Sequence, residues 1–245
     1  MTTFLMISGW GAPGVALHPL ATRLGGSASD ACLSVHDLPT HAGNTEIAGM
    51  SSYATGLIAL LDRLPEPCVL LGWSMGGIVA LEAAAARPDC ISRLVLCAST
   101  AKFVSGPGYA VAVPPSEMRA FDRGLRHAAR ATLEQFHQTA ARPRKLEPST
   151  LEERVGASLR FGDASLTQGL AYLRKADHRP VLDKIHVPTL VLHGQTDAVI
   201  PVSAGLWLAE HLPDAQCEIL AGHGHDLPRE VVEDIALRIQ AFITI

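Results

Sequence analysis

The chain has 245 residues, enough for one α/β domain with a sizeable core and an insertion. Apolar residues make up 48% and charged residues 18%, which excludes a disordered chain. The formal net charge of −4 gives no electrostatic reason to expect a nucleic-acid partner. No apolar run reaches the ~18 residues that a membrane-spanning helix needs, so we expect no membrane association.

The N-terminal segment and the cysteines indicate a cytoplasmic protein. Residues 1–14 lack the basic region of a signal peptide, and we expect a strand that runs into a functional loop. Most of the five cysteines lie in or beside apolar runs, so we expect them to be reduced and buried. The spacing of the cysteines suggests no zinc site, and we expect no metal and no cofactor. We also expect a monomer.

Short apolar runs alternate with segments of helical periodicity along most of the chain. The expected strands are residues 4–8, 32–36, 68–73, 94–99, 189–194 and 217–220. The expected helices are residues 50–64, 77–87, 202–212 and 229–243. This alternation predicts a mostly parallel, doubly wound α/β sheet with helices on both faces.

The alternation stops between residues 101 and 180. A loop comes first, then one long helical pattern over 116–140, a break over 141–148, and further helices over 151–161 and 166–177. We predict that 101–180 is a helical lid, inserted into a core domain of residues 1–100 and 181–245. The lid carries a charge of +5 and the remainder −9, which fits either a solvated helix face or a docking surface for an acidic partner.

The strongest catalytic signal is the motif Gly72-Trp73-Ser74-Met75-Gly76, between an expected strand and an expected helix. A G-x-S-x-G motif in this context is a nucleophile elbow, whose strained turn needs small flanking residues. The helix N-terminus behind the serine favours the oxyanion that develops during acyl transfer. The motif therefore predicts an α/β-hydrolase fold with Ser74 as the nucleophile.

A nucleophilic serine needs a base and an acid, which in this fold follow it in the order Ser, acid, His. His225 lies in the loop after the last expected strand and is the favoured base, with His223 as its competitor. A metal-binding H-x-H pair would lack a third ligand. Asp197 follows the preceding strand and is the expected acid, whereas Asp177 and Asp183 come before that strand and fit solvated helix ends better.

The tetrahedral intermediate needs two N–H donors. Met75, directly after the nucleophile, offers one backbone N–H, and the loop after the first strand offers the other through Trp10. The alternative for Trp10 is that of a core aromatic residue.

Several segments together resemble one family of carboxylesterases. They are GWSMGG, the early SGWG loop, HDLPTHAG, HGQTDAVIP and the loop that carries His225, which we call the histidine loop (residues 221–225). The sequence resembles the BioH group, the pimeloyl-[acyl-carrier protein] methyl ester carboxylesterases of biotin synthesis. The similarity extends through the lid, over residues 118–136 and 166–194. Three features depart from the family: Ser8 replaces a usual His, the N-terminal strand or hairpin is reduced, and the Gly-Pro and Arg-Pro lid segments differ.

The resemblance implies a triad of Ser74, Asp197 and His225, with Trp10 and Met75 at the oxyanion. It also implies an acyl-chain pocket lined by the lid stretch Phe136-His137-Gln138-Thr139-Ala140. In that family lid arginines hold an acidic carrier protein. The candidates here, at three- or four-residue spacing on one expected helix, are Arg119, Arg123, Arg126 and Arg130.

We therefore predict hydrolysis of the methyl ester of pimeloyl-[acyl-carrier protein], with small-molecule esters as further substrates. One alternative is a general short-chain carboxylesterase or a carbon–carbon bond hydrolase on the same scaffold. Another is a non-catalytic binding protein of this fold, although such proteins normally lose members of the triad.

Overall fold

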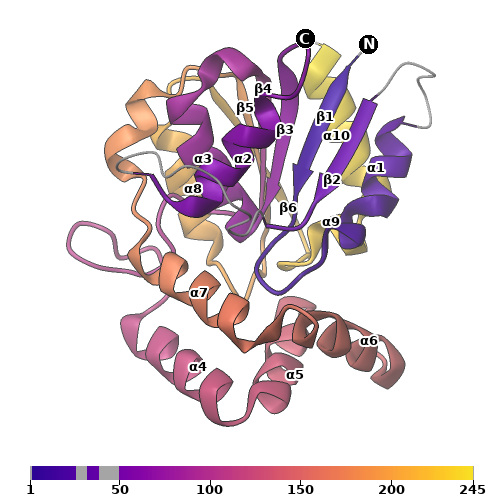
Figure 1. Cartoon of the computed structure of the whole chain (residues 1–245), viewed down its shortest axis with the longest axis vertical. Helices are drawn as coiled ribbons and strands as arrows, with labels where there is room; N and C mark the ends of the chain where they lie inside the picture. Colours follow the sequence, from indigo (N-terminus) through magenta and orange to yellow (C-terminus); the bar gives the residue numbers. More distant parts are fainter. Residues whose placement is uncertain (1, 26–31, 39–49, 245) are drawn as a thin grey trace.

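The computed structural model describes residues 2–25, 32–38 and 50–244 (Figure 1). Its strands form one parallel sheet in the order β2-β1-β3-β4-β5-β6. The strands are β1 Thr3–Ile7, β2 Cys32–His36, β3 Cys68–Trp73, β4 Ile91–Cys97, β5 Thr189–Gly194 and β6 Ala215–Leu220. The predicted α/β fold class is confirmed, and most strand boundaries lie within a residue or two of those expected.

Helices cover both faces of the sheet because side chains alternate across each strand. Phe4 and Met6 of β1 pack on the face covered by α1 His18–Gly25 and α10 Val232–Thr244. Leu5 and Ile7 pack on the opposite face. That face is covered by α2 Ser52–Leu61, α3 Met75–Ala86 and α8 Val202–His211. The short helix α9 Leu227–Glu230 precedes α10, and Val231, with φ of −131° and ψ of 46°, separates the two.

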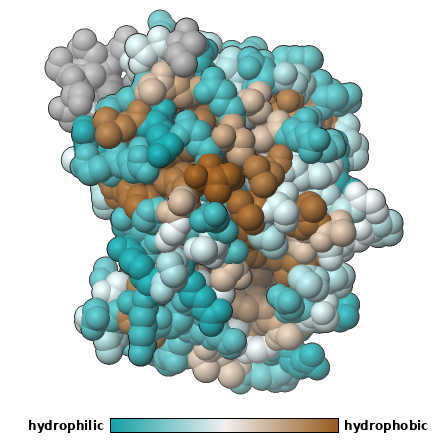
Figure 2. Space-filling model, turned by 180° about the vertical axis from the view of Figure 1, so that it is seen from behind, coloured by the Kyte–Doolittle hydropathy of each residue, from teal (hydrophilic) through white to brown (hydrophobic). Residues whose placement is uncertain are grey.

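Between β4 and β5 the chain builds a helical layer beyond one end of the sheet (Figure 1). We call this layer the insertion. Its helices are α4 Pro115–His127, α5 Ala129–Ala140, α6 Pro148–Leu159 and α7 Gly162–Lys175. From the opposite side, apolar residues gather near the middle of the molecule, between hydrophilic regions above and below (Figure 2).

The long helix expected over 116–140 is two helices, which corrects the placement of the arginines. Ala128 leaves the helical conformation, with φ of −150° and ψ of 57°, so Arg130 lies on α5 and not on the helix that carries the other three. Gly124 of α4 packs closely against Thr132 of α5, since an added Cβ at Gly124 would lie 2.7 Å from Thr132 Oγ1. Tertiary packing of this kind overrides helical periodicity.

The free cysteines of the described residues differ in how far they are buried. Cys68 and Cys97 are buried free thiols, whereas Cys90 and Cys217 are free but only half-buried, which corrects the expectation of full burial. The side chain of Cys32 and residues 39–43 of the HDLPTHAG segment lie outside the described residues.

No helix in the described ranges is long and apolar enough to span a bilayer.

Candidate active site

The site lies where the chain reverses its direction of progress across the sheet. From β1 the chain moves outward to β2, then returns to place β3 on the other side of β1. Ile7 is level with Gly72, so the loops after β1 and β3 begin side by side at the carboxyl ends of the strands. A parallel α/β sheet opens a crevice at such a point, and ligands bind there.

Ser74 occupies a strained turn between β3 and α3. Its φ of 56° and ψ of −121° are rarely adopted by a residue with a side chain. The turn is tight because a Cβ at Gly72 would lie 2.5 Å from Gly77 Cα, and a Cβ at Gly76 would lie 2.5 Å from Ile7 O. The glycines of the motif are therefore required by close approach of the backbone.

Ser74, His225 and Asp197 form a continuous hydrogen-bonded chain. His225 Nε2 lies 2.9 Å from Ser74 Oγ, and His225 Nδ1 lies 2.8 Å from Asp197 Oδ2. His225, Ser74 and the Asp197 carboxylate are all buried. The three residues come from the loops after β3, β5 and β6, so the sheet brings together positions up to 151 residues apart.

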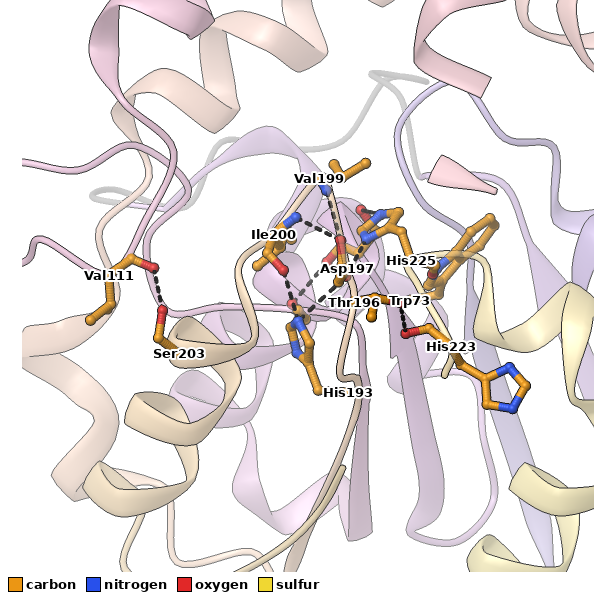
Figure 3. Close-up of polar contacts among 12 residues, drawn as sticks. Trp73, Val111, His193, Thr196, Asp197, Val199, Ile200, Ser203, His223 and His225 are labelled. Atoms are coloured by element: carbon orange, nitrogen blue, oxygen red, sulfur yellow. Dashed lines mark hydrogen bonds and ion pairs between the residues drawn. The ribbon is translucent and has the colours of Figure 1, made fainter. Parts of the chain in front are cut away.

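Backbone and side-chain donors hold Asp197 in place (Figure 3). Its Oδ1 accepts hydrogen bonds from the N–H groups of Val199 and Ile200, each at 2.8 Å. Its Oδ2 lies between His225 and His193, whose Nε2 is 3.3 Å away. Burial would raise the pKa of the Asp197 carboxyl, but the neighbouring histidines hold it below its usual value. Asp197 is therefore ionised at neutral pH.

The charge of Asp197 controls the basicity of His225. Burial lowers the pKa of the His225 imidazole, but the Asp197 carboxylate opposes this effect and raises that pKa above its ordinary 6.5. A histidine with such a partner can accept a proton from Ser74 and remain stable as the imidazolium.

The competing residues His223 and Asp177 do not join the hydrogen-bonded chain of Ser74, His225 and Asp197. The ring of His223 points away from Asp197, and only its backbone carbonyl contacts the acid's loop, through Thr196 (Figure 3). Asp177 pairs with Lys102 and Arg179. No group of three or more metal-ligating side chains occurs among the described residues, so the H-x-H alternative gains no third ligand.

The expected oxyanion donors flank Ser74. Met75 begins α3, so its N–H has no acceptor within the helix. Gly9 packs against the serine, since a Cβ there would lie 3.0 Å from Ser74 Cβ. The N–H of Trp10, the next residue, finds no acceptor within the described ranges, whereas its side-chain Nε1–H donates to Leu166 O at 2.9 Å. Neither backbone N–H therefore has a competing acceptor among the described residues, as the role expected of both requires.

A pocket of about 380 Å³ opens beside Ser74, between the sheet and the insertion. Most of its lining is apolar. The lining side chains include Trp10, Phe103, Val113, Met118, Phe121, Phe136, Leu170 and Leu173. The pocket therefore suits an aliphatic acyl chain.

The five-residue stretch predicted to line the pocket divides between two faces of α5. Phe136 and Thr139 line this pocket, since residues three apart share a face of a helix. His137 and Ala140 line a smaller cavity that also touches Ser74 and His225. Gln138 instead binds the backbone of Leu146. The prediction that all five line one pocket is corrected accordingly.

Sequence reasoning missed a buried ionic cluster behind His225. Asp226 pairs with Arg154 of α6 and lies 3.6 Å from Arg229. The Arg229 guanidinium in turn covers the ring of Trp73, and the Trp73 Nε1–H donates to His225 O at 3.1 Å. The sequence signal was the run His225-Asp226 followed by Arg229, but its insertion partner is 72 residues away and could not be paired by spacing.

Comparison with known proteins identifies the family of the chain. The model of the alpha/beta hydrolase family matches residues 4–236, almost the whole chain. The chain belongs to the alpha/beta hydrolase family. The predicted class of enzyme, a hydrolase, is confirmed by this membership.

Relatives with a named activity show which group within this family the chain resembles. It is 31% identical over 212 residues to the pimeloyl-[acyl-carrier protein] methyl ester esterase of Chromobacterium violaceum, covering 86% of this chain and 82% of that protein. It is 34% identical over 190 residues to the esterase of the same name from Aromatoleum aromaticum, covering 74% and 76%. The resemblance to the BioH group expected from the motifs is confirmed.

Solved structures support the fold. An esterase from Exiguobacterium antarcticum matches with a TM-score of 0.89 at 20% identity, covering 100% of this chain and 92% of that one. A bromoperoxidase from Bacillus anthracis matches with a TM-score of 0.87 at 18% identity, with the same coverage. At these identities the matches show the shared fold alone.

Proposed function

We propose that this hydrolase is a serine carboxylesterase that cleaves the methyl ester of pimeloyl-[acyl-carrier protein] in biotin synthesis. The observation that carries the chemistry is the chain Ser74–His225–Asp197, with hydrogen-bond distances of 2.9 and 2.8 Å. The choice of substrate rests on the relatives of that name, at 31% and 34% identity over most of their length.

The proposed reaction is a two-step acyl transfer. His225 Nε2 accepts the proton of Ser74 Oγ as that oxygen attacks the ester carbonyl carbon, and the N–H groups of Trp10 and Met75 stabilise the oxyanion. His225 then donates the proton to the methoxy oxygen, and methanol leaves. A water molecule, deprotonated by His225, attacks the acyl-serine and releases the free carboxylate, and Ser74 recovers its proton.

The pocket and the insertion suit such a substrate. The apolar lining would accept the methylene chain, and the +5 charge of residues 101–180 would attract an acidic carrier. Arg126 pairs with Asp122, and Arg130 pairs with Glu152. Arg119 and Arg123 are exposed on α4 and form no ion pair within the described residues, so they are the carrier contacts that we favour.

The test is direct. Purified protein incubated with the methyl ester of pimeloyl-[acyl-carrier protein] is expected to release methanol, and Ser74→Ala is expected to release none. The matched cellular test is growth without biotin in a strain that lacks its own esterase, rescued by the wild type but not by Ser74→Ala. A wild type that is silent on the carrier substrate but active on short aryl esters would leave the general carboxylesterase as the function.

The proposal includes a monomer that acts in the cytoplasm, the compartment of its carrier-protein substrate. Size-exclusion chromatography with light scattering tests the first point, and a mass near 26.0 kDa is expected.

A further inference from the structure

The loop after β1, which we call the oxyanion loop (residues 8–12), is hydrogen-bonded to the insertion. Ser158 of α6 is fully buried, and its hydroxyl donates to the carbonyl oxygen of Gly11 at 2.6 Å. Gly11 directly follows Trp10 and has a φ of 64°, so its conformation is one that few other residues adopt easily. A hydrogen bond from Ser158 therefore fixes the loop beside the proposed oxyanion donor.

A buried histidine sets the direction of this hydrogen bond. His137 Nε2 lies 2.9 Å from Ser158 Oγ, and His137 Nδ1 has no partner among the described residues. Burial lowers the pKa of His137 to about 4, so the imidazole is neutral at pH 7. A neutral ring carries one proton, and only Nε2 has an acceptor to share it with. His137 thus donates to Ser158. The Ser158 hydroxyl faces two acceptors, Gly11 O at 2.6 Å and Arg154 O at 3.1 Å, and the shorter distance favours Gly11.

The insertion also holds the side chain of Trp10. Its indole N–H donates to Leu166 O of α7, and its ring packs edge-on against Phe121 and Phe136, with centroids 5.4 and 5.3 Å apart. Gly169 allows this approach, since a Cβ there would lie 2.5 Å from the indole. The residue that offers the N–H is therefore fixed through its side chain as well.

The core supplies little in place of these contacts. Ser8, at the start of the oxyanion loop, is fully buried, and its hydroxyl has no hydrogen-bond partner among the described residues. The loop's backbone makes hydrogen bonds from Ser8 N to His36 O and from Ala12 N to Gly9 O, both at 3.2 Å. The second contact joins the Gly11–Ala12 peptide, whose carbonyl accepts from Ser158, to the Gly9–Trp10 peptide, which carries the Trp10 N–H.

We propose that Ser158, oriented by His137, is a positioning residue: it fixes the Gly11–Ala12 peptide and, through the Ala12 N–H bond to Gly9 O, aims the Trp10 N–H at the oxyanion. This inference rests on the proposed acyl-transfer role of Ser74 and Trp10. The insertion then has a part in the chemical step besides forming a pocket, because donors must be aimed before charge develops if they are to stabilise it.

The experiment distinguishes a loss of orientation of the Trp10 N–H from a loss of protein stability. In Ser158→Ala, kcat for p-nitrophenyl butyrate is expected to fall about tenfold with KM within twofold, a part of the ~10²–10³ that a lost donor costs. The inhibition constant of an alkyl trifluoromethyl ketone is expected to rise by a similar factor, since its serine adduct places an oxyanion in the same hole. Ser158→Thr keeps the hydroxyl and is expected to recover most of both losses.

A matched control removes a buried hydroxyl whose hydrogen bond lies outside the oxyanion loop. Tyr109 and Thr100 share a buried hydrogen bond of 2.7 Å, so Tyr109→Phe is expected to lower the melting temperature while kcat and the inhibition constant stay within twofold of wild type. If Ser158→Ala fails to fold, His137→Leu removes only the orienting donor and is expected to lower kcat by a smaller factor.

The outcomes distinguish this proposal from the proposed function. Wild-type kcat and inhibition constant in folded Ser158→Ala, or in His137→Leu where that variant replaces it, would overturn the positioning role. So would equal losses in Ser158→Thr and Ser158→Ala. Retained aryl-ester hydrolysis in Ser74→Ala would instead overturn the nucleophile. Failure on the carrier substrate alone would remove the proposed substrate and leave the positioning role standing on the aryl ester.

Discussion

The guanidinium of Arg154, on α6, forms an ion pair with the carboxylate of Asp226, the residue directly after His225. The side chains are 14% and 1% exposed, respectively, so the pair is largely removed from water. One partner comes from the insertion and the other from the loop that carries the proposed base. The insertion is therefore attached to that loop through a buried charge pair, as it is to the oxyanion loop through Ser158.

We predict that Arg154→Met lowers the free energy of unfolding by about 3 kcal/mol, because it leaves the Asp226 carboxylate buried beside a weaker partner, Arg229 at 3.6 Å. The control is Arg130→Ala, which removes an exposed pair with Glu152 and is expected to cost less than ~1 kcal/mol. Urea denaturation of the three proteins measures both values. Equal small losses in the two variants would mean that the buried pair contributes no more than a surface one.

The pH dependence follows from the raised pKa of His225. Only the neutral imidazole can accept the proton of Ser74, so kcat/KM is expected to rise with pH and to reach half its plateau above pH 6.5. In Asp197→Asn the carboxylate that raises this pKa is lost and burial is left to lower it. The half-plateau point is then expected at lower pH, and kcat is expected to fall by about 10⁴-fold. Profiles of kcat/KM from pH 5 to 9 for both proteins test this prediction. If the acidic limb lies at the same pH in Asp197→Asn as in the wild type, Asp197 does not raise the pKa of His225.

The carrier contacts can be tested without touching the pocket. We predict that the double substitution Arg119→Ala/Arg123→Ala raises KM for the carrier substrate about tenfold and leaves aryl-ester kinetics within twofold. The matched pair Arg126→Ala/Arg130→Ala is expected to change KM less, because these side chains already pair with Asp122 and Glu152. The difference should shrink in high salt, which screens exposed charges. Equal effects of the two pairs would contradict our choice of arginines.

Much of the site could be predicted from sequence because its parts follow the fold's strand order. The loops after β3, β5 and β6 carry Ser74, Asp197 and His225, and a parallel sheet must bring those loops together. The break at Ala128 could not be predicted, since both sides of it have the same helical periodicity. The contacts of Arg154 and Ser158 are also tertiary, 72 and 147 residues from their partners, and no local pattern pairs residues at such distances.

The last prediction concerns a glycine where the insertion touches the histidine loop. Gly224 directly precedes His225, and a Cβ at this position would overlap the backbone carbonyl oxygen of Arg142, in the segment between α5 and α6. A backbone oxygen cannot rotate away as a side chain does, so Gly224→Ala must displace either the insertion or the loop that holds His225. We expect it to cost at least ~1–3 kcal/mol of stability and, since it shifts His225, to lower kcat more than tenfold.

Gly156 of α6 is the matched control for this substitution. It lies inside a helix, and nothing is within 4 Å of a Cβ built there, so Gly156→Ala is expected to raise stability by about 0.5–1 kcal/mol with unchanged kcat. Melting curves and aryl-ester kinetics of both variants test the contrast. Wild-type kcat in folded Gly224→Ala would show that the contact with Arg142 is dispensable for placing His225. The insertion would then be linked to the segment after His225 through ion pairs, those of Arg154 with Asp226 and of Arg144 with Glu230.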